Sequence, residues 1–433
     1  MNNDIKDFLL YVKLILPEYF LNINVIDIGG SDINGNNRYL FNNCNYIAND
    51  VVKAPNINLV SRTSKLSFDS NTFDTIISTQ CFEHDPEYNL SLKKILDMLK
   101  PNGLFLFTCS SYGKEEHGTG ANKINDSYGA IVNIHSMANY YKNLTCNDID
   151  EIINVKMNFS YYDFYYNKLS KNLYFWGIKK EGNITTKILK YNNENVINLT
   201  LHNIVIYYHI CANEGDKVLN IIKEQLNLLQ TSNLYYLVKQ INCCLVGNDL
   251  RNYNWVLNNI NTFGEKFRIV KSKFKNKDYE RFTFNYIKNS LDHDLCLYLH
   301  SKGITKTEHY TFNNVVSWRK CMEYFLIENA EICIDKILKE NYDTVGIMKI
   351  TNPNHYHGNF WWGKTSYLKE LFNNHFIDPE YIGPELFLFK NNPNFCDLYP
   401  IFTYNSKFSG YFNTLIYSEY SNHLKKNIEI SDS

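Results

Sequence analysis

Several absences in this sequence exclude broad classes of function. Lys and Arg total 44 and Asp and Glu total 45 among 433 residues, so the chain has no excess of positive charge. Binding to nucleic-acid phosphates needs such an excess on one face, and we therefore expect no nucleic-acid partner. The sequence also lacks an uninterrupted run of about 18 apolar residues, so we expect no transmembrane segment.

The cysteines lack the spacing of a disulfide or metal framework. Eleven cysteines are scattered along the chain, none of them in a Cys-x-x-Cys pair. An odd number without regular spacing is typical of reduced thiols. The first residues are not a signal peptide, because charged residues interrupt the apolar ones between positions 4 and 13, and they predict an amphipathic helix. We therefore predict a cytoplasmic protein, in the host cytoplasm if the sequence is viral.

Length and pattern predict two α/β domains. A chain of 433 residues is long enough for two domains, and strand-like and helix-like segments alternate in both halves. Polar turn clusters separate the two halves. We predict one domain at residues 1–182, a linker at 183–202, a second domain at 203–418 and a polar tail at 419–433.

The most informative segment is Val-Ile-Asp-Ile-Gly-Gly at residues 25–30. Its apolar residues predict a buried parallel strand. Gly29 and Gly30 predict a tight turn where a ligand approaches the backbone, with a helix expected next. Asp50 ends another short segment roughly 20 residues later, a distance at which an acidic residue suits the hydroxyls of a ribose. Together these features predict a nucleoside-containing cofactor.

Glycine spacing separates the two cofactors that fit this pattern. A dinucleotide site requires Gly-x-Gly-x-x-Gly at the start of a helix, whereas four other residues separate the glycine pair from Gly35. S-adenosylmethionine has no pyrophosphate to bind, so a looser turn is enough. Residues 73–85 then predict another strand that ends in a polar loop. A helix at 90–99 and a buried strand at 104–108 follow.

The first half resembles the class I S-adenosylmethionine-dependent methyltransferases. The resemblance covers roughly residues 1–180 and implies a Rossmann-like domain that binds S-adenosylmethionine. It rests on the order and spacing of five features: the Asp27-Ile28-Gly29 turn, Asp50, the Phe73-Asp74 strand opening, the Glu83-His84 pair and the Leu-Lys-Pro-Asn-Gly-Leu stretch at 99–104. Under this resemblance the cofactor contacts are Asp27, Gly29, Gly30, Asp50 and Glu83.

A glycine-rich loop after the strand at 104–108 bears on the acceptor. Its segment at 115–119 resembles the Glu-His-Gly-Thr loop of a subgroup of these methyltransferases. Methyl transfer to a hydroxyl requires alignment of the acceptor and removal of its proton. His117 is the first candidate for this base, and His84 is the second because it also follows a strand. A divalent cation held by His117 with the two preceding glutamates is an alternative.

Three further segments mark the second half. A buried strand at 295–299 ends in His300-Ser301-Lys302-Gly303, which places phosphate- or metal-binding side chains at its carboxyl end. The segment at 355–363 joins Asn359 to three successive aromatic residues, and aromatic faces stack on sugars. The third segment, at 381–387, contains Glu385 after a turn.

In this order, the three segments resemble the rhamnan-synthesis glycosyltransferase-like family over about residues 203–415. The resemblance implies a GT-A-type fold that binds a nucleotide sugar and a glycan acceptor. It implies substrate contacts from His300, Lys302, Asn359, Trp361 and Trp362, and Glu385 as the base of an inverting transfer. The usual Asp-x-Asp metal site is displaced, because Asp292-His293-Asp294 precedes the strand. Either Lys302 neutralises the diphosphate directly, or His300 binds Mn²⁺ or Mg²⁺.

These observations predict a bifunctional enzyme of glycan synthesis. One domain methylates a sugar hydroxyl with S-adenosylmethionine, and the other transfers a glycosyl group from a nucleotide sugar. Two alternatives stay open at this point. The second domain is a carbohydrate-binding module without turnover, or the methyltransferase acts on a protein or a small metabolite.

Overall fold

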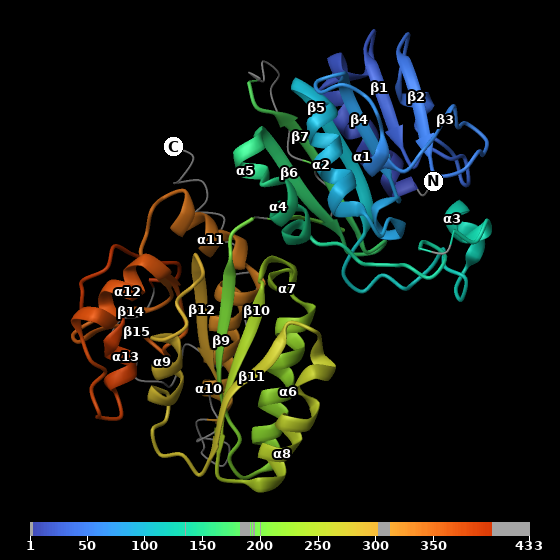
Figure 1. Ribbon diagram of the computed structural model, residues 1–433. Helices are drawn as coiled ribbons and strands as arrows, with labels where there is room; N and C mark the ends of the chain where they lie inside the picture. Colours follow the sequence, from blue (N-terminus) through green and yellow to red (C-terminus); the bar gives the residue numbers. More distant parts are fainter. Residues whose placement is uncertain are drawn as a thin grey trace. The chain divides into compact units, whose positions relative to one another are not determined.

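The computed structural model describes residues 3–134, 136–181, 191, 193, 195–199, 201–301 and 312–400. The chain divides into two compact units, residues 1–201 and 202–433, each with its own sheet (Figure 1). Both units are α/β, as the alternating sequence pattern predicts. In the described part of the chain, no helix has the length and apolar character needed to cross a bilayer.

The first unit is built on an eight-stranded sheet in the order β3-β2-β1-β4-β5-β7-β6-β8. The first five strands in this order, from β3 through β1 to β5, run parallel. Strand β7 runs antiparallel to both β5 and β6. The order reverses at β1, so the carboxyl ends of β1 and β4 diverge there and leave room for a ligand. The strands are β1 (Asn24–Ile28), β2 (Asn45–Asp50), β3 (Leu59–Val60), β4 (Phe73–Thr79), β5 (Leu99–Ser110), β6 (Phe159–Asn167), β7 (Asn172–Lys179) and β8 (Val196–Leu199).

Alternation along the strands provides this sheet with two apolar faces. On β5, Leu104 and Leu106 pack in one core with the amphipathic helix α1, whereas Phe105 and Phe107 contact the ring of Phe82 on the other face. The helices of the unit are α1 (Asn3–Ile15), α2 (Tyr88–Met98), α3 (Tyr128–Ile131), α4 (Cys146–Ile153) and α5 (Val155–Asn158). The predicted N-terminal helix and the helix predicted at 90–99 are confirmed as α1 and α2.

The helix expected directly after the glycine turn does not form. Only the short 3₁₀ helix η2 (Arg38–Leu40) lies between β1 and β2. Asp32 accepts hydrogen bonds from the Gly35 amide at 3.0 Å and from the Asn36 side chain at 2.7 Å. Short polar side chains that bond nearby groups in this way compete with helical hydrogen bonds, and they favour a loop.

Part of the segment predicted to be a linker belongs to the first sheet. Strand β8 lies within residues 183–202 and pairs antiparallel with β6, where Leu199 faces Phe164. Its apolar residues Ile197 and Leu199 are buried. The apolar Ile197 and Leu199, with the polar Asn198 between them, are the sequence signal of this strand.

The second unit has a seven-stranded sheet in the order β11-β10-β9-β12-β16-β13-β17. Strands β11, β10, β9 and β12 run parallel, and β16 runs antiparallel to its two neighbours. A separate hairpin joins β14 and β15. The strands are β9 (Ile204–Cys211), β10 (Gln240–Gly247), β11 (Phe267–Phe274), β12 (Leu295–His300), β13 (Thr344–Gly346), β14 (Lys349–Thr351), β15 (Asn354–Tyr356), β16 (Trp361–Lys364) and β17 (Phe395–Asp397).

The helices of the second unit match the predicted alternation. Helix α6 follows the first strand of this unit, and α10 contains Trp318. Their bounds, with those of the other helices, are α6 (Asp216–Thr231), α7 (Leu234–Leu237), α8 (Leu250–Asn259), α9 (Arg281–Ile287), α10 (Phe312–Glu323), α11 (Ala330–Leu338), α12 (Thr365–Asn374) and α13 (Gly383–Phe387).

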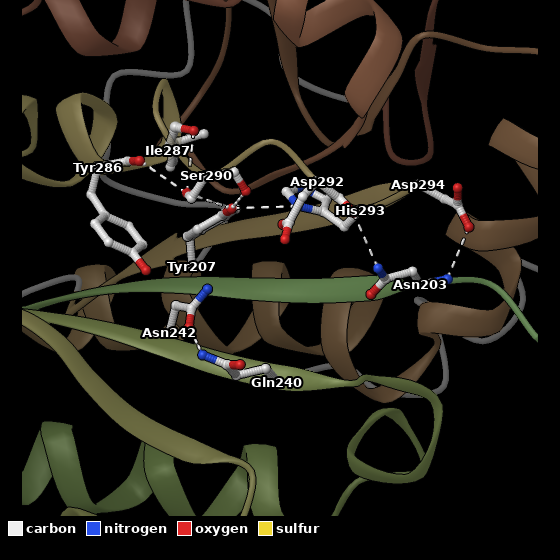
Figure 2. A network of polar contacts seen from close by, with 10 residues as sticks. All are labelled: Asn203, Tyr207, Gln240, Asn242, Tyr286, Ile287, Ser290, Asp292, His293 and Asp294. Carbon is white, nitrogen blue, oxygen red and sulfur yellow. Dashed lines mark hydrogen bonds and ion pairs between the residues drawn. The ribbon is translucent and has the colours of Figure 1, made fainter. Parts of the chain in front are cut away.

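The Asp292-His293-Asp294 segment lies at the amino end of β12 and serves the fold there (Figure 2). Asp294 accepts a hydrogen bond from the Asn203 amide at 2.9 Å, which joins the starts of β12 and β9. The buried ring of His293 lies 3.5 Å from the Tyr207 hydroxyl. Ligands of open α/β sheets bind at the opposite, carboxyl ends of the strands. The segment is therefore placed to fix the strands rather than to hold a diphosphate.

Candidate functional site

A pocket of about 490 Å³ opens at the carboxyl ends of β1 and β4 in the first unit. Gly29 and Gly30 from the end of β1 and Thr79 and Gln80 from the end of β4 line it. This is the point where the strand order reverses, and the volume lies in the range of small-molecule sites. The predicted glycine turn thus forms part of a pocket wall.

The glycine turn is closely packed. Gly29 has φ +68°, and a Cβ atom there would lie 2.4 Å from Cys81 Sγ. The Gly30 amide donates to the Asn49 carbonyl at 3.0 Å, which joins the turn to β2. A side chain at Gly29 would strain the backbone and press against Cys81, just after β4, and one at Gly30 would lie 3.0 Å from Asp27. This explains why the segment carries glycine where it meets the pocket.

Asp27 lines the pocket but is itself held by two neighbours. Its carboxylate accepts hydrogen bonds from the Tyr46 hydroxyl and, at 3.0 Å, from the Asn37 amide. Burial raises the pKa of Asp27 to about 6, against the lowering effect of these hydrogen bonds. The cofactor contact predicted for Asp27 is compatible with this position at the pocket wall.

Asp50 ends β2 and lies beside the pocket rather than in its lining. The Ser31 hydroxyl, which does line the pocket, donates to Asp50 at 2.6 Å, and the Val51 amide donates to the other oxygen at 2.7 Å. Burial raises the pKa of Asp50. Its predicted role as the ribose acceptor stays a prediction, and Ser31 is the residue through which it reaches the pocket surface.

Two histidines from separate segments meet at one wall of the pocket. His84 belongs to the 3₁₀ helix η4 (Phe82–His84) after β4, and His117 belongs to the glycine-rich loop after β5. Their ring centroids are 5.1 Å apart, and the ring of Tyr141 lies 5.0 Å from that of His117. Burial, and then the proximity of His117, lowers the pKa of His84 to about 3. The structure thus brings together both candidate bases that the sequence predicts.

Glu83 lies behind this wall and is fully buried. Its Oε1 atom accepts from the Ser110 amide at 3.1 Å and from the Ser110 hydroxyl at 3.0 Å. Burial raises the pKa of Glu83 to about 7. Glu83 therefore ties the end of β4 to the end of β5, and the direct cofactor contact predicted for it does not match this position.

The two glutamates that precede His117 make different contacts, one through its side chain and one through its backbone. Glu116 is exposed and accepts from the Thr119 hydroxyl at 2.7 Å, which shapes the loop. The Glu115 carbonyl contacts His117 Nδ1 at 3.0 Å. A carbonyl can only accept, so Nδ1 carries the proton and Nε2 has the free lone pair. The predicted cation site at 115–117 does not assemble.

Several lining residues carry no motif in the sequence. Lys114, Lys123, Lys171, Asn37 and Gln80 all border the pocket. They come from four separate segments, and only the fold brings them together. A sequence signal exists for Gln80 alone, because it directly follows a predicted strand.

In the second unit, a polar cluster lies at the carboxyl end of β12. His300 Nε2 donates to the Gly358 carbonyl at 3.0 Å and lies 3.9 Å from Glu280. Glu280 also accepts from the Tyr298 hydroxyl at 2.8 Å and from the Asn359 amide at 2.5 Å. The structure thus joins His300 to Asn359 through Glu280, a residue that sequence reasoning missed because it lies in a polar stretch without a motif.

The other residues predicted as site residues of the second unit lie in different places. Trp361 and Trp362 are 1% and 0% exposed, so they are core residues and offer no ring face to a sugar. Glu385 lies in the first turn of the short helix α13, and its Oε2 atom is 4.0 Å from His355 Nε2. Lys302 lies outside the described residues. Within the described part of the chain, His300 is not joined by two further metal-ligand side chains.

Comparisons with known families agree with the division into two units. Residues 27–107 match the family described as a methyltransferase domain. Residues 206–378 match a domain of unknown function, DUF8361. No curated protein matches the chain.

Solved structures similar to the chain include three methyltransferases. A 1,6-didemethyltoxoflavin-N1-methyltransferase from Burkholderia thailandensis, solved with S-adenosylhomocysteine, is 18% identical, with a TM-score of 0.29, and the match covers 40% of this chain and 77% of that one. A possible histamine N-methyltransferase from Thermotoga maritima is 12% identical, with a TM-score of 0.28 and coverage of 40% and 89%. Phosphoethanolamine N-methyltransferase 2 from Haemonchus contortus is 17% identical, with a TM-score of 0.28 and coverage of 41% and 53%. The match at residues 27–107 identifies a methyltransferase domain in the first unit.

Proposed function

We propose that the first unit uses S-adenosylmethionine to methylate a hydroxyl group. The observation that carries this proposal is the pocket at the carboxyl ends of β1 and β4, lined by the adjacent Gly29 and Gly30. The methyltransferase-domain match begins at Asp27, near the end of β1, and includes the whole of β4. A nucleoside cofactor fits this position because the strand order reverses there.

The reaction needs little from the protein beyond alignment and loss of one proton. The acceptor oxygen attacks the methyl carbon in line as the bond from carbon to sulfur breaks, and the neutral thioether leaves. His117 is the candidate base, because its Nε2 lone pair is available and its side chain lines the pocket. His84 is the weaker base, since a group with a pKa of about 3 holds a proton poorly at neutral pH.

The acceptor class is proposed as a sugar hydroxyl. Polar and cationic side chains form much of the pocket wall, among them Lys114, Lys123 and Lys171. Such a wall suits an oxygen-rich or anionic acceptor better than an apolar one. A protein side chain or a small metabolite as acceptor is the alternative.

Calorimetry on the full chain tests the cofactor, and product analysis tests the acceptor. S-adenosylmethionine at 100 times its dissociation constant stabilises a protein by about 2.7 kcal/mol. For a unit of this size the shift in melting temperature is roughly 5 to 10 °C. No shift with either S-adenosylmethionine or S-adenosylhomocysteine would overturn the proposal. Radiolabelled methyl groups recovered in protein, and not in glycan, would favour the alternative acceptor.

For the second unit we propose glycosyl transfer from a nucleotide sugar. The supporting observation is the cluster of Glu280, His300 and Asn359 at the carboxyl end of β12, next to β9, where the strand order of this sheet also reverses. In this proposal Glu385 activates the acceptor hydroxyl, and Mn²⁺ or Mg²⁺ assists the diphosphate.

The rival function of the second unit is carbohydrate binding without turnover. The full chain, incubated with a panel of UDP-, GDP- and dTDP-sugars and Mn²⁺, is expected to hydrolyse or transfer one class of donor. Glu280→Gln should lower that rate by at least 10-fold, because it removes the charge that positions His300. Glycan binding with no turnover of any donor would leave the binding module as the correct function.

A further inference from the structure

Three side chains of the metal-ligand type converge beside the methyl-transfer pocket. Glu83 and His84 come from η4 after β4, and His117 comes from the loop after β5. One ligand atom of each lies within 4.8 Å of the other two. No other group of three such side chains occurs among the described residues. His117 lies 33 positions after His84 in the chain, so the arrangement is a product of the fold.

Two polar atoms of these side chains lack a hydrogen-bond partner. Glu83 Oε2 and His84 Nδ1 are buried, and neither has a hydrogen-bond partner within the described parts of the chain. The other Glu83 oxygen already accepts two hydrogen bonds from Ser110. A buried carboxylate oxygen without a partner is costly, and a cation removes that cost.

A hydrogen bond orients the ring of one of the two histidines. His117 donates its Nδ1 proton to the Glu115 carbonyl at 3.0 Å, which leaves Nε2 as the ligand atom. Ligand histidines are usually oriented by such a hydrogen bond from the other ring nitrogen.

We propose that Glu83, His84 and His117 bind one divalent transition-metal ion. Two imidazoles and one carboxylate suit Zn²⁺, Mn²⁺, Fe²⁺ or Co²⁺, whereas Ca²⁺ and Mg²⁺ prefer oxygen ligands alone. Ligands at about 2.1 Å from one ion lie roughly 3 Å apart, so binding draws the loop of His117 inward by about 1 to 2 Å. The nearby cation Lys114 directs its Nζ to the Ser170 carbonyl at 2.7 Å and does not occupy the site.

The role of the ion rests on the proposed methyl transfer. Three protein ligands leave coordination positions open toward the pocket, which His84 and His117 line. An acceptor hydroxyl bound there has a lower pKa and loses its proton to water. Its oxygen then attacks the methyl carbon as the bond to sulfur breaks. In this form of the site His117 is a ligand, and the ion takes over the task of the base.

Direct metal titration of the full chain tests the site without reference to activity. The protein, freed of any affinity tag and of metal by chelation, is titrated with Co²⁺ under visible absorbance and with Zn²⁺ by calorimetry. We expect one equivalent to bind. His117→Ala and Glu83→Gln should each weaken binding by at least about 10-fold, since even an outer partner of a ligand has this effect. Glu116→Gln, in the same loop but outside the cluster, is the matched control and should bind like the wild type.

Each outcome separates the metal site from the proposed function. Equal affinity in the wild type and both ligand variants, or no saturable binding by the wild type, overturns the metal site. Circular dichroism on Glu83→Gln detects misfolding, and His117→Ala carries the test if that variant is unfolded. Binding of S-adenosylmethionine by a chain that binds no metal refutes the site alone. Metal binding without S-adenosylmethionine binding refutes the proposed function and leaves the site in place.

Discussion

At the scale of single residues, the buried acid Asp27 makes stability depend on pH. Its pKa in the folded protein is about 6, above the value of 3.8 in an unfolded chain. A carboxyl of this kind binds its proton more tightly when folded, so stability falls as the pH rises from about 4 to 6 and is constant above. The difference of roughly two pKa units corresponds to about 3 kcal/mol.

Replacement of Asp27 by Asn removes this dependence. We compare the free energy of local unfolding in Asp27→Asn and in the wild type. The value for the variant minus that for the wild type should increase by about 3 kcal/mol as the pH rises from 4 to 7. Hydrogen exchange of peptides from β1, read by mass spectrometry at several pH values, measures it. Glu83 and Asp163 also have raised pKa values, but they titrate in both proteins and cancel in the difference. A difference that does not change with pH would show that Asp27 is not the titrating group.

Trp362 tests whether an aromatic segment serves the core or a ligand. Its side chain is fully buried, and its indole nitrogen donates to the Leu326 carbonyl at 2.9 Å. Trp362→Ala should destabilise the second unit by about 3 to 5 kcal/mol. Denaturation followed by hydrogen exchange of β16 measures this loss. Phe376, a large aromatic that is 78% exposed, is the control, and Phe376→Ala should change stability little.

Residue chemistry was predictable only in part. The sequence pointed to Asp27 because it lies near the end of a strand before a glycine turn, and to His117 because it lies in a glycine-rich loop after a strand. The sequence could not reveal hydrogen-bond partners that come from other strands. Tyr46 on β2 donates to Asp27, and Ser110 at the end of β5 donates to Glu83. The burial of Trp361 was equally hidden, because an aromatic run has the same letters in a core as in a binding site.

At the scale of elements, the glycine turn after β1 combines conformational strain with close packing. Gly29 and Gly113 share φ +68°, so an alanine at either position costs about 1 to 2 kcal/mol. At Gly29 the new Cβ would also lie 2.4 Å from Cys81 Sγ, whereas at Gly113 its nearest neighbour is 3.9 Å away. Gly29→Ala should therefore cost about 1 to 3 kcal/mol more than Gly113→Ala and weaken cofactor binding.

The pair of variants is compared by thermal denaturation and by titration with S-adenosylmethionine. Gly113→Ala accounts for the strain alone, so any additional loss in Gly29→Ala reports the packing against Cys81. Equal stability of the two variants would mean that Cys81 moves aside without cost. Relief of the defect in Gly29→Ala by Cys81→Gly would confirm the contact.

Strand β8 is the element that sequence reasoning assigned to the wrong region. It covers β6 with Ile197 and Leu199, and Tyr191 packs against Phe8 and Tyr165 from the same segment. A strand of four residues between polar turns gives a weak periodic signal, and its pairing with β6 depends on the whole sheet. The helix predicted after the glycine turn is absent for a local reason. Hydrogen bonds to the side chain of Asp32 favour a loop there.

Removal of β8 should destabilise the first unit. A chain ending at residue 182 loses β8 and leaves the edge of β6 unpaired, whereas a chain ending at 201 keeps both. Burial of Ile197 and Leu199 alone is worth roughly 1.5 to 3 kcal/mol each. We expect 1–182 to melt well below 1–201 and to associate through its open edge. Calorimetry and light scattering measure the two effects, and equal melting temperatures would contradict the role of β8.

At the scale of the whole molecule, the chain folds into two units, and each unit is built on its own sheet. No strand is shared among the described residues, and each unit has its own apolar core. The alternating sequence pattern was enough to predict this division, because each half contains a complete set of strands and helices. Strand order was beyond reach, since it is fixed by contacts between segments distant in the sequence.

Separate cores predict that a ligand of one unit stabilises that unit alone. S-adenosylmethionine should raise the melting temperature of residues 1–201 by roughly 5 to 10 °C at 100 times its dissociation constant and leave residues 202–433 unchanged. In the full chain the same ligand should move one of two calorimetric transitions, since domains with independent cores unfold independently. Gly29→Ala in the full chain is the matched control, because it weakens the pocket and should reduce the shift. A single transition that moves as a whole would instead show that the units are coupled in unfolding, and the second unit would then contribute to the stability of the cofactor site.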